Sequence, residues 1–184
     1  SIRSTEDIAD TSKDGKVREQ LKKHDYYAVV RSDADAVSKI IASLKADELR
    51  NFSRTCVLYC GEMADLVHRY SGVTIYSGGD DLLALLPAES SSGETVFHFA
   101  RDAKDLFQKS FKTYIDAIKA ANAEKKPGEE PIPVPSLSLG ISICYSKFPL
   151  YEALDDSADL LFLFSTVRII NLKLARAKLS CLLY

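Results

Sequence analysis

Several features that would narrow the function class are missing from this sequence. Its 4 cysteines include no Cys-x-x-Cys pair, and nothing indicates a secreted disulfide framework. Lys and Arg number 24 against 26 Asp and Glu. The resulting net charge of −2 argues against a general nucleic-acid-binding surface, although it leaves room for a small, locally positive nucleotide pocket. There is no signal peptide and no apolar run of about 20 residues. We therefore expect a cytoplasmic protein with no membrane association.

What is present is an ordinary globular composition. The 184 residues, 46% apolar and 27% charged, suit one domain whose core needs no disulfide or metal to hold it. Cys56 and Cys60 are four residues apart and would share one face of a helix. We interpret them as buried thiols, with a metal or redox role as the alternative. The chain begins with Ser rather than Met, which suggests a processed protein or a piece of a larger one.

Hydrophobic periodicity predicts alternating strands and helices. Two short apolar runs around a Gly-Gly turn are a strong hairpin signal, and the prolines of residues 124–135 mark a surface loop. The predicted elements are a strand at 26–31, helices at about 37–44 and 46–70, strands at 73–76 and 82–86, a long helix at about 95–123, a strand at 136–145 and a helix at about 150–164.

This order predicts an α+β, ferredoxin-like βαββαβ fold with an antiparallel sheet, one inserted helix, one appended helix, and the helices on one face. The domain would occupy residues 25–164. Residues 1–24 are interpreted as a polar N-terminal arm or short helix. The apolar segment 165–184 is left open between a final helix and strand and a surface that packs on a neighbour.

Acidic residues are predicted to meet at one edge of this sheet. Asp33 follows the first strand, and Asp80 and Asp81 follow Gly78-Gly79 in the hairpin turn. Carboxylates at adjacent strand ends can hold the two divalent ions used in nucleotidyl transfer. The glycines permit a tight turn and a close approach of nucleotide to backbone. The sequence therefore predicts a site for a divalent metal and a nucleoside triphosphate.

The helix after Asp33 supplies a second element of the predicted site. Its free N–H groups would cradle phosphates, and Lys39 lies in its early turns. The alternatives are an ordinary Gly-Gly-Asp-Asp turn, an Asp33-x-Asp35 pair that only caps a helix, and an Asp81 that faces solvent.

Three separated segments resemble the palm domain in the large subunit of type III CRISPR effector complexes. They are residues 26–41 (YYAVVRSDADAVSKII), 75–89 (IYSGGDDLLALLPAE) and 136–161 (SLSLGISICYSKFPLYEALDDSADLL). The first resembles the family's opening strand and helix, the second its Gly-Gly-Asp-Asp hairpin, and the third its fourth strand and following helix. The Leu-Ala-Leu-Leu-Pro ending of the hairpin favours the Cmr branch over Csm.

The resemblance implies a nucleotidyl-cyclase or polymerase-type palm that makes cyclic oligoadenylates from ATP with Mg²⁺ or Mn²⁺. Its partners would be ATP, other subunits of a type III complex with guide RNA and target RNA, and a second palm that brings two nucleotides together. The family's motifs assign metal binding to Asp33, Asp80 and Asp81 and catalysis to Asp80 and Asp81. Nucleotide binding is assigned to Ala34, Asp35, Lys39, Gly78 and Gly79.

The sequence also departs from the family. The usual first motif is Asp-Gly-Asp-x-Met-Gly-Lys, whereas Ala34 and Ser38 replace both glycines here and crowd the phosphate-facing backbone. The family's other domains and its basic segment after the last palm helix are not evident in this sequence. One alternative is therefore a non-catalytic palm that serves as an assembly module. Another is a GGDEF-type dinucleotide cyclase, against which Asp81 and Leu82 at the end of the motif argue.

Other polar residues are given structural interpretations. The pair His24-Asp25 suggests an HD phosphohydrolase, but His68 and His98 lie in helical contexts unsuited to complete that site. A run of cations near the C-terminus is interpreted as solvated or partner-facing rather than phosphate-binding. These cations are Arg168, Lys173, Arg176 and Lys178.

Overall fold

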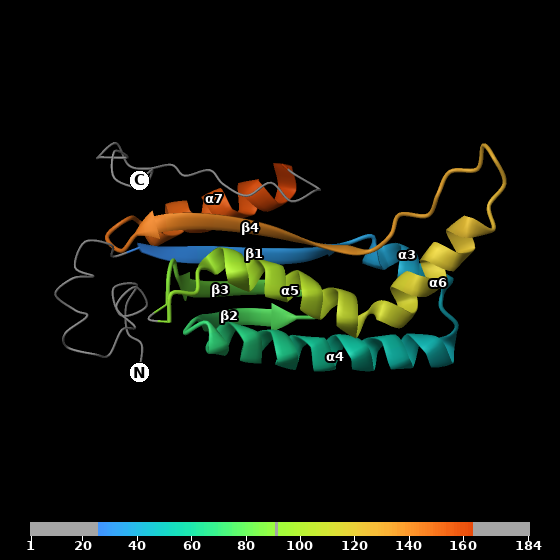
Figure 1. The fold of residues 1–184 in the computed structure, drawn as a ribbon, viewed down its shortest axis with the longest axis horizontal. Coiled ribbons are helices and arrows are strands. Elements are labelled where there is room, and N and C mark those ends of the chain that lie inside the picture. Colours follow the sequence, from blue (N-terminus) through green and yellow to red (C-terminus); the bar gives the residue numbers. More distant parts are fainter. Residues whose placement is uncertain (1–25, 91, 164–184) are drawn as a thin grey trace.

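The computed structural model describes residues 26–90 and 92–163 (Figure 1). The predictions for the N-terminal arm, for His24-Asp25 and for segment 165–184 with its basic residues fall outside this part of the chain. Within it, no helix is long and apolar enough to span a bilayer.

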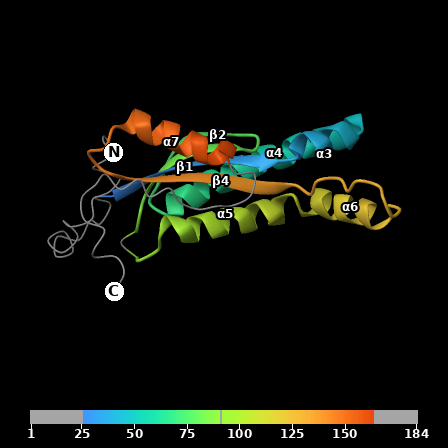
Figure 2. The ribbon, with the colours of Figure 1, turned by 90° about the horizontal axis from the view of Figure 1, so that it is seen from above.

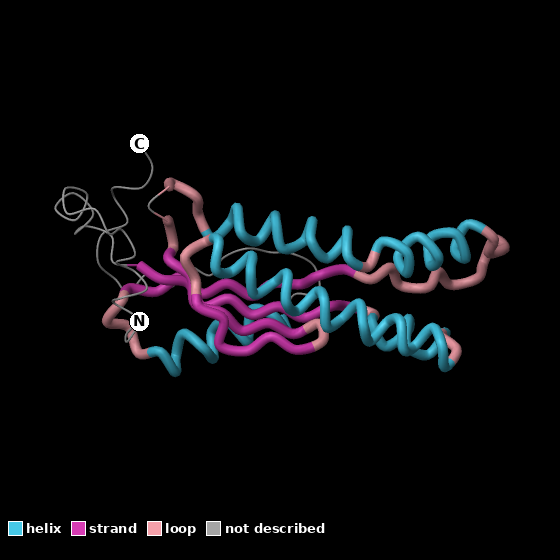
Figure 3. The backbone as a smooth tube through the Cα atoms, turned by 90° about the horizontal axis from the view of Figure 1, so that it is seen from below, coloured by secondary structure: helices cyan, strands magenta, loops and turns pink. Residues whose placement is uncertain are grey.

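The sheet has the order that a ferredoxin-like fold requires. Its strands are β1 (Tyr26–Asp35), β2 (Val73–Gly78), β3 (Asp81–Pro87) and β4 (Ser136–Tyr145). They run in the order β2-β3-β1-β4, and every neighbouring pair is antiparallel (Figure 1). Figure 3 shows the strands side by side, with helices running along them. The predicted α+β class and antiparallel sheet are confirmed. The first strand continues past its predicted end, so that Asp33 lies inside β1 rather than after it.

The helices match their predicted positions with one exception. They are α3 (Val37–Ser43), α4 (Ala46–Arg69), α5 (Val96–Ser110), α6 (Lys112–Ala123) and α7 (Leu150–Leu163). The single helix expected at 95–123 is wrong, because Phe111 leaves the helical conformation and separates α5 from α6. The Phe111 side chain at this break is fully buried in the core.

The helices cover both faces of the sheet, which corrects the expectation of a one-sided arrangement. Figure 2 shows α5 on one side of the sheet and α7 on the other. α7 packs on β4 and β1, where a Cβ added to Gly140 would collide with the backbone carbonyl of Ser157 and lie 2.9 Å from the backbone nitrogen of Leu161. A glycine in β4 therefore lets α7 approach this strand closely, between Ser138 and Ser142 on the same face.

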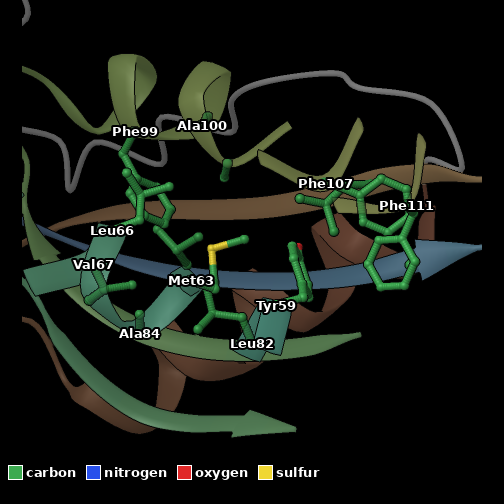
Figure 4. Packing of buried hydrophobic residues seen from close by; sticks show 14 of the residues in the cluster. Tyr59, Met63, Leu66, Val67, Leu82, Ala84, Phe99, Ala100, Phe107 and Phe111 are labelled. Carbon is green, nitrogen blue, oxygen red and sulfur yellow. The ribbon is translucent and has the colours of Figure 1, made fainter. Parts of the chain in front are cut away.

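The larger core lies between the sheet and the α4–α5 layer. Side chains from both helices meet over β3 in Figure 4, where Met63 and Leu66 of α4 face Phe99 of α5. An aromatic group extends this core toward the far end, with the rings of Phe107 and Phe111 4.8 Å apart and those of Tyr59 and Phe111 5.2 Å apart. Buried apolar area of this kind is the main source of folding free energy.

Two adjacent small residues at the end of α4, Ser71 and Gly72, have different structural roles. The N–H of Gly72 donates to the carbonyl of Val67 and that of Ser71 to the carbonyl of His68, which is a Schellman motif. The left-handed position is occupied by Ser71, with φ 59°. Gly72 instead permits a close approach, because a Cβ there would lie 2.8 Å from Cγ of Leu86 and 2.9 Å from the carbonyl oxygen of Leu85.

We predict opposite effects on stability from substitutions at these two neighbours. Ser71→Gly should raise the free energy of unfolding by about 0.5–1 kcal/mol, because glycine tolerates the left-handed backbone. Gly72→Ala should lower it by about 1–3 kcal/mol, because the new methyl group overpacks against β3. Urea denaturation of both variants measures the difference. A stabilising Gly72→Ala would contradict this assignment of roles.

Candidate functional site

The predicted acidic residues lie in one row across the sheet. Gly78 of β2 is opposite Asp81 of β3. The β1–β3 register pairs Ser32 with Leu82, so Asp33 and Asp81 are the next positions along the same ladder. Across β1, Asp33 is opposite Ser138 of β4. We call Gly78, Asp81, Asp33 and Ser138 the acidic row.

The acidic row faces the side of the sheet that carries α7. Val29 belongs to the cluster that packs against Ala153 of α7, and alternate residues of a strand share a face. Arg31 agrees with this assignment, because its Nε donates a 3.3 Å hydrogen bond to Oγ of Ser157. Asp33, two residues further on, therefore lies on the face opposite the larger core.

Mutual repulsion shows that the carboxylates converge. Burial raises the pKa of Asp33 above its usual value, and the charges of Asp80, Asp81 and Asp35 raise it further. The pKa of Asp80 is also raised, first by burial and then by the charge of Asp81, against a lowering hydrogen bond from its own backbone. Crowded anions of this kind favour a cation between them, which is the electrostatic condition for a metal site.

The hairpin turn is the two residues Gly79 and Asp80, and α4 holds it in place. Gly79 has φ +67°, whereas Gly78 does not take a left-handed conformation. The thiol of Cys60 donates to the carbonyl of Gly79 at 3.3 Å, and the hydroxyl of Ser77 donates to the carbonyl of Cys60 at 3.3 Å. Cys60 thus holds the turn in place, whereas the prediction of buried thiols is wrong for Cys56 and Cys60, because both side chains are only partly buried.

Cys56, one turn earlier on α4, is the other thiol near the hairpin. Burial and then the charge of Asp80 raise the pKa of Cys56 to about 11. Cys56 is therefore a neutral thiol at physiological pH and a poor nucleophile. Among the described residues, no group of three or more His, Cys, Asp or Glu side chains is arranged to hold a metal ion, so a thiol metal site is not indicated.

Asp35 lies one row beyond the acidic row and has its own partners. Its carboxylate accepts hydrogen bonds from the hydroxyls of Ser136 at 3.1 Å and Ser138 at 2.5 Å. Ser138 is buried. Asp35 also interacts electrostatically with Lys104 of α5. Burial lowers the pKa of Lys104, and the charge of Asp35 offsets part of this lowering. Hydrogen bonds therefore hold the Asp35 side chain against β4, whereas the Asp33 carboxylate interacts electrostatically with the acids of the hairpin.

The remaining predicted nucleotide-binding residues are spread over the start of α3. The Ala34 side chain is buried in the larger core, so only its backbone can face a ligand. Lys39 is exposed on the seven-residue α3, and its N–H donates to the carbonyl of Ala36 at 3.0 Å. This N–H group is already hydrogen-bonded within the protein, so the predicted phosphate-binding site has one backbone donor fewer. Ala36 itself is held at φ 62°, a conformation that costs an alanine about 1 kcal/mol.

The chemistry of the acids fits Mg²⁺ or Mn²⁺. Both ions prefer hard oxygen ligands, and Mg²⁺ usually takes one or two carboxylates together with substrate phosphates. Burial and then the charges of Asp80 and Asp81 raise the pKa of Asp33, and burial and then the charge of Asp81 raise that of Asp80; a bound cation would oppose these shifts. A preassembled three-ligand cage, which the described residues lack, is not required for this mode of binding.

Three contributors to this region were not predicted from the sequence. They are Ser138, Cys60 and Tyr76. Ser138 donates a hydrogen bond to Asp35, Cys60 donates one to the carbonyl of the turn, and Tyr76 lies beside Gly78. The alternation of serine with apolar residues in β4 was a signal for a polar inner row, since Ser138 and Ser142 proved to be buried. Nothing in the sequence pattern indicated that a thiol of α4 would reach a carbonyl of the hairpin.

Together, the sheet order, the acidic hairpin and the flanking helices define a palm-type domain. A sequence profile described as "Cas10/Cmr2, second palm domain" matches residues 26–165. The chain therefore belongs to the Cas10/Cmr2 second palm domain family, and the predicted family is confirmed.

Two comparisons add detail to this membership. The chain is 31% identical over 126 residues to the CRISPR system Cmr subunit Cmr2 of Pyrococcus furiosus, which covers 68% of the chain and 10% of that protein. Its fold is similar to that of Csm1 from T. onnurineus, with a TM-score of 0.58, 14% identity, and coverage of 88% of this chain and 21% of that one. A Csm1–Csm4 cassette in complex with pppApA gives a TM-score of 0.55 at 13% identity, over 86% of this chain and 20% of that one. The chain thus spans about a tenth of Cmr2 and a fifth of Csm1.

Proposed function

We propose that this palm domain binds ATP with Mg²⁺ or Mn²⁺ and synthesises cyclic oligoadenylates within a type III CRISPR complex in the cytoplasm. The observation that carries the proposal is the strand register, which puts Asp33 of β1 and Asp81 of β3 at neighbouring positions next to the turn that holds Asp80. Membership in the Cas10/Cmr2 family supports the setting, because Cmr2 is a subunit of a CRISPR system. The Csm1–Csm4 cassette, a structural relative, forms a complex with the oligoadenylate pppApA, which supports the choice of nucleotide.

In the proposed reaction, the 3′-hydroxyl of one ATP attacks the α-phosphorus of another. A new P–O bond forms to the α-phosphorus, the bond from that phosphorus to the bridging β-phosphate oxygen breaks, pyrophosphate leaves with that electron pair, and the proton of the 3′-hydroxyl passes to water. Bound Mg²⁺ or Mn²⁺ would lower the pKa of the attacking hydroxyl and neutralise the charge of the leaving phosphates. The chain's task is to position these groups and to supply negative charge where the cations bind.

Each part of the site has a share in that task. Asp33 and Asp81 present carboxylates from adjacent strands, and Asp80 adds a third from the turn. Gly78 and Gly79 carry no side chains of their own where the nucleotide is proposed to approach; a Cβ on Gly79 would lie in open space, and one on Gly78 would meet the Tyr76 phenol. We assign the hold on the cations to these acids and a phosphate contact to the ammonium group of Lys39.

The competing proposal is a non-catalytic palm that helps to assemble the complex. One observation favours it: the described residues contain no preassembled metal-binding group. Ala34 and Ser38 in place of the family's glycines point the same way. Under this proposal the chain still assembles with partner subunits, guide RNA and target RNA, but it does not consume ATP.

A labelled-ATP assay separates the two proposals. We expect the chain, supplied with Mg²⁺ or Mn²⁺ and partner subunits, to form oligoadenylates and pyrophosphate. The paired substitution Asp80→Ala and Asp81→Ala should abolish both products, because two of the converging carboxylates are lost. Chelation by EDTA should do the same to the unmodified chain.

A matched control comes from the solvent side of α4, where Asp65 is exposed. Asp65→Ala should leave product formation unchanged. Formation of equal product by the doubly substituted chain would overturn the catalytic proposal. Complete absence of product from the unmodified chain in a target-bound complex would favour the assembly role.

A further inference from the structure

We infer that Tyr76, with Leu83 behind it, forms the surface on which the nucleobase of the bound nucleoside triphosphate stacks. This inference rests on the proposed function, because it takes the triphosphate to lie at Asp33, Asp80 and Asp81. It adds a base-binding site next to the phosphate-binding site and assigns the role to residues outside the Gly-Gly-Asp-Asp motif.

The register places these residues in a row directly beside the acidic row. Tyr76 of β2 is opposite Leu83 of β3, and Leu83 is opposite Arg31 of β1. Each member lies two residues along its strand from a member of the acidic row, so both rows share one face of the sheet. We call Tyr76, Leu83 and Arg31 the second row. A ligand anchored at Asp81 would therefore find an aromatic and an aliphatic side chain at the next position.

α7 leaves the β2 end of this face uncovered. The helix packs on β4 and β1, and Arg31 is engaged there by Ser157. Toward the other edge, Leu83 is only partly buried, and the Tyr76 side chain is 55% exposed. An aromatic ring left this open beside an acidic site has surface free for stacking, which every nucleobase can provide.

The phenol of Tyr76 lies against Gly78, the last residue of β2 before the hairpin turn. A Cβ added to Gly78 would collide with the Tyr76 hydroxyl and lie 2.8 Å from its Cζ. The ring thus lies over the backbone that the nucleotide is proposed to approach. Among the described residues, no hydrogen bond or ring contact restrains the Tyr76 side chain. The ring is therefore able to rotate away from Gly78 and onto an entering base.

The test compares a ligand that has a base with one that has none. Binding of MgATP and of magnesium tripolyphosphate to the full chain is measured by calorimetry. Tyr76→Ala should weaken MgATP binding by about tenfold, the order expected from the loss of one base–aromatic stack. Binding of tripolyphosphate should stay unchanged, because its contacts lie in the acidic row. Tyr76→Phe should retain the affinity of the unmodified chain for MgATP.

Ile75 supplies the matched control. It is the neighbouring residue on the same edge strand and is 56% exposed. Ile75→Ala should change neither affinity. Equal MgATP binding by Tyr76→Ala and the unmodified chain, with tripolyphosphate still bound, would overturn the stacking role alone. Failure of the unmodified chain to bind either ligand would overturn the proposed function and this inference with it.

Discussion

Asp33→Asn should lower oligoadenylate synthesis by about a hundredfold or more, while leaving the protein folded and more stable at neutral pH. The loss follows from removal of one carboxylate from a site whose cations contribute several kcal/mol to the reaction. The gain follows first from burial, which disfavours the charged carboxylate, and then from repulsion by Asp80, Asp81 and Asp35; all of these raise the pKa of Asp33. One substitution would thus separate activity from stability.

The direction of the expected stability change follows from how the charge of Asp33 depends on pH. The pKa of Asp33 is higher in the folded protein than its usual value, so folding disfavours the charged form. The stability that Asp33 contributes is complete below the pKa of an unfolded aspartate and is lost as the pH rises through the raised pKa. We expect D33N to melt above the unmodified chain at pH 7 and the gap to close on acidification. The gain should be about 1 kcal/mol or less, because Asp33 is only partly buried and water screens the repulsion.

Thermal melts from pH 4 to pH 8, with and without Mg²⁺, check both halves of the prediction. Added Mg²⁺ should raise the Tm of the unmodified chain and not that of D33N, because a ligand stabilises only the form that binds it. Asp65→Asn is the control for loss of a carboxylate elsewhere. Melting of D33N below the unmodified chain at pH 7 would show that the acids do not repel one another.

Phe111→Ala should lower the free energy of unfolding by about 3–5 kcal/mol, the cost of a large cavity in a packed core. Phe111 is fully buried, and its ring contacts those of Phe52, Tyr59 and Phe107. It also occupies the break between α5 and α6, so the cavity would open where two helices change direction. Few single substitutions elsewhere in the described chain should cost as much.

Phe97, on the helix α5 that ends just before Phe111, offers a matched control. Its side chain is 37% exposed, and Phe97→Ala should cost less than about 1 kcal/mol. Urea denaturation of both variants gives the two free energies. Similar costs for the two substitutions would contradict the central place of Phe111 in the core.

The βαββαβ order was predictable because each element carries its own signal. The alternation in Ser136–Tyr145 predicted β4, and the Gly-Gly turn predicted the hairpin. The break at Phe111 was not predictable, since Phe107 and Phe111 continue one helical stripe with no proline or glycine between them. Phe111 is fully buried at the break, and its departure from helical dihedrals is not visible in the periodicity of the segment.

The site was predictable to a similar depth. The sequence indicated that Asp33 would meet the hairpin acids, because the fold brings those strands together. It did not indicate which face they share, since that depends on register, and a shift of one residue would move Asp33 to the other side. The hold of Ser138 on Asp35 joins residues 103 positions apart and follows from the same register.

The opposite-face arrangement of the acidic row and the larger core has an evolutionary consequence. The larger core between α4, α5 and the sheet side beneath them contains none of the carboxylates to which we assign the proposed chemistry. A gene copy that lost those carboxylates would still encode a protein that folds. Chemistry and architecture can therefore be inherited, or lost, one without the other.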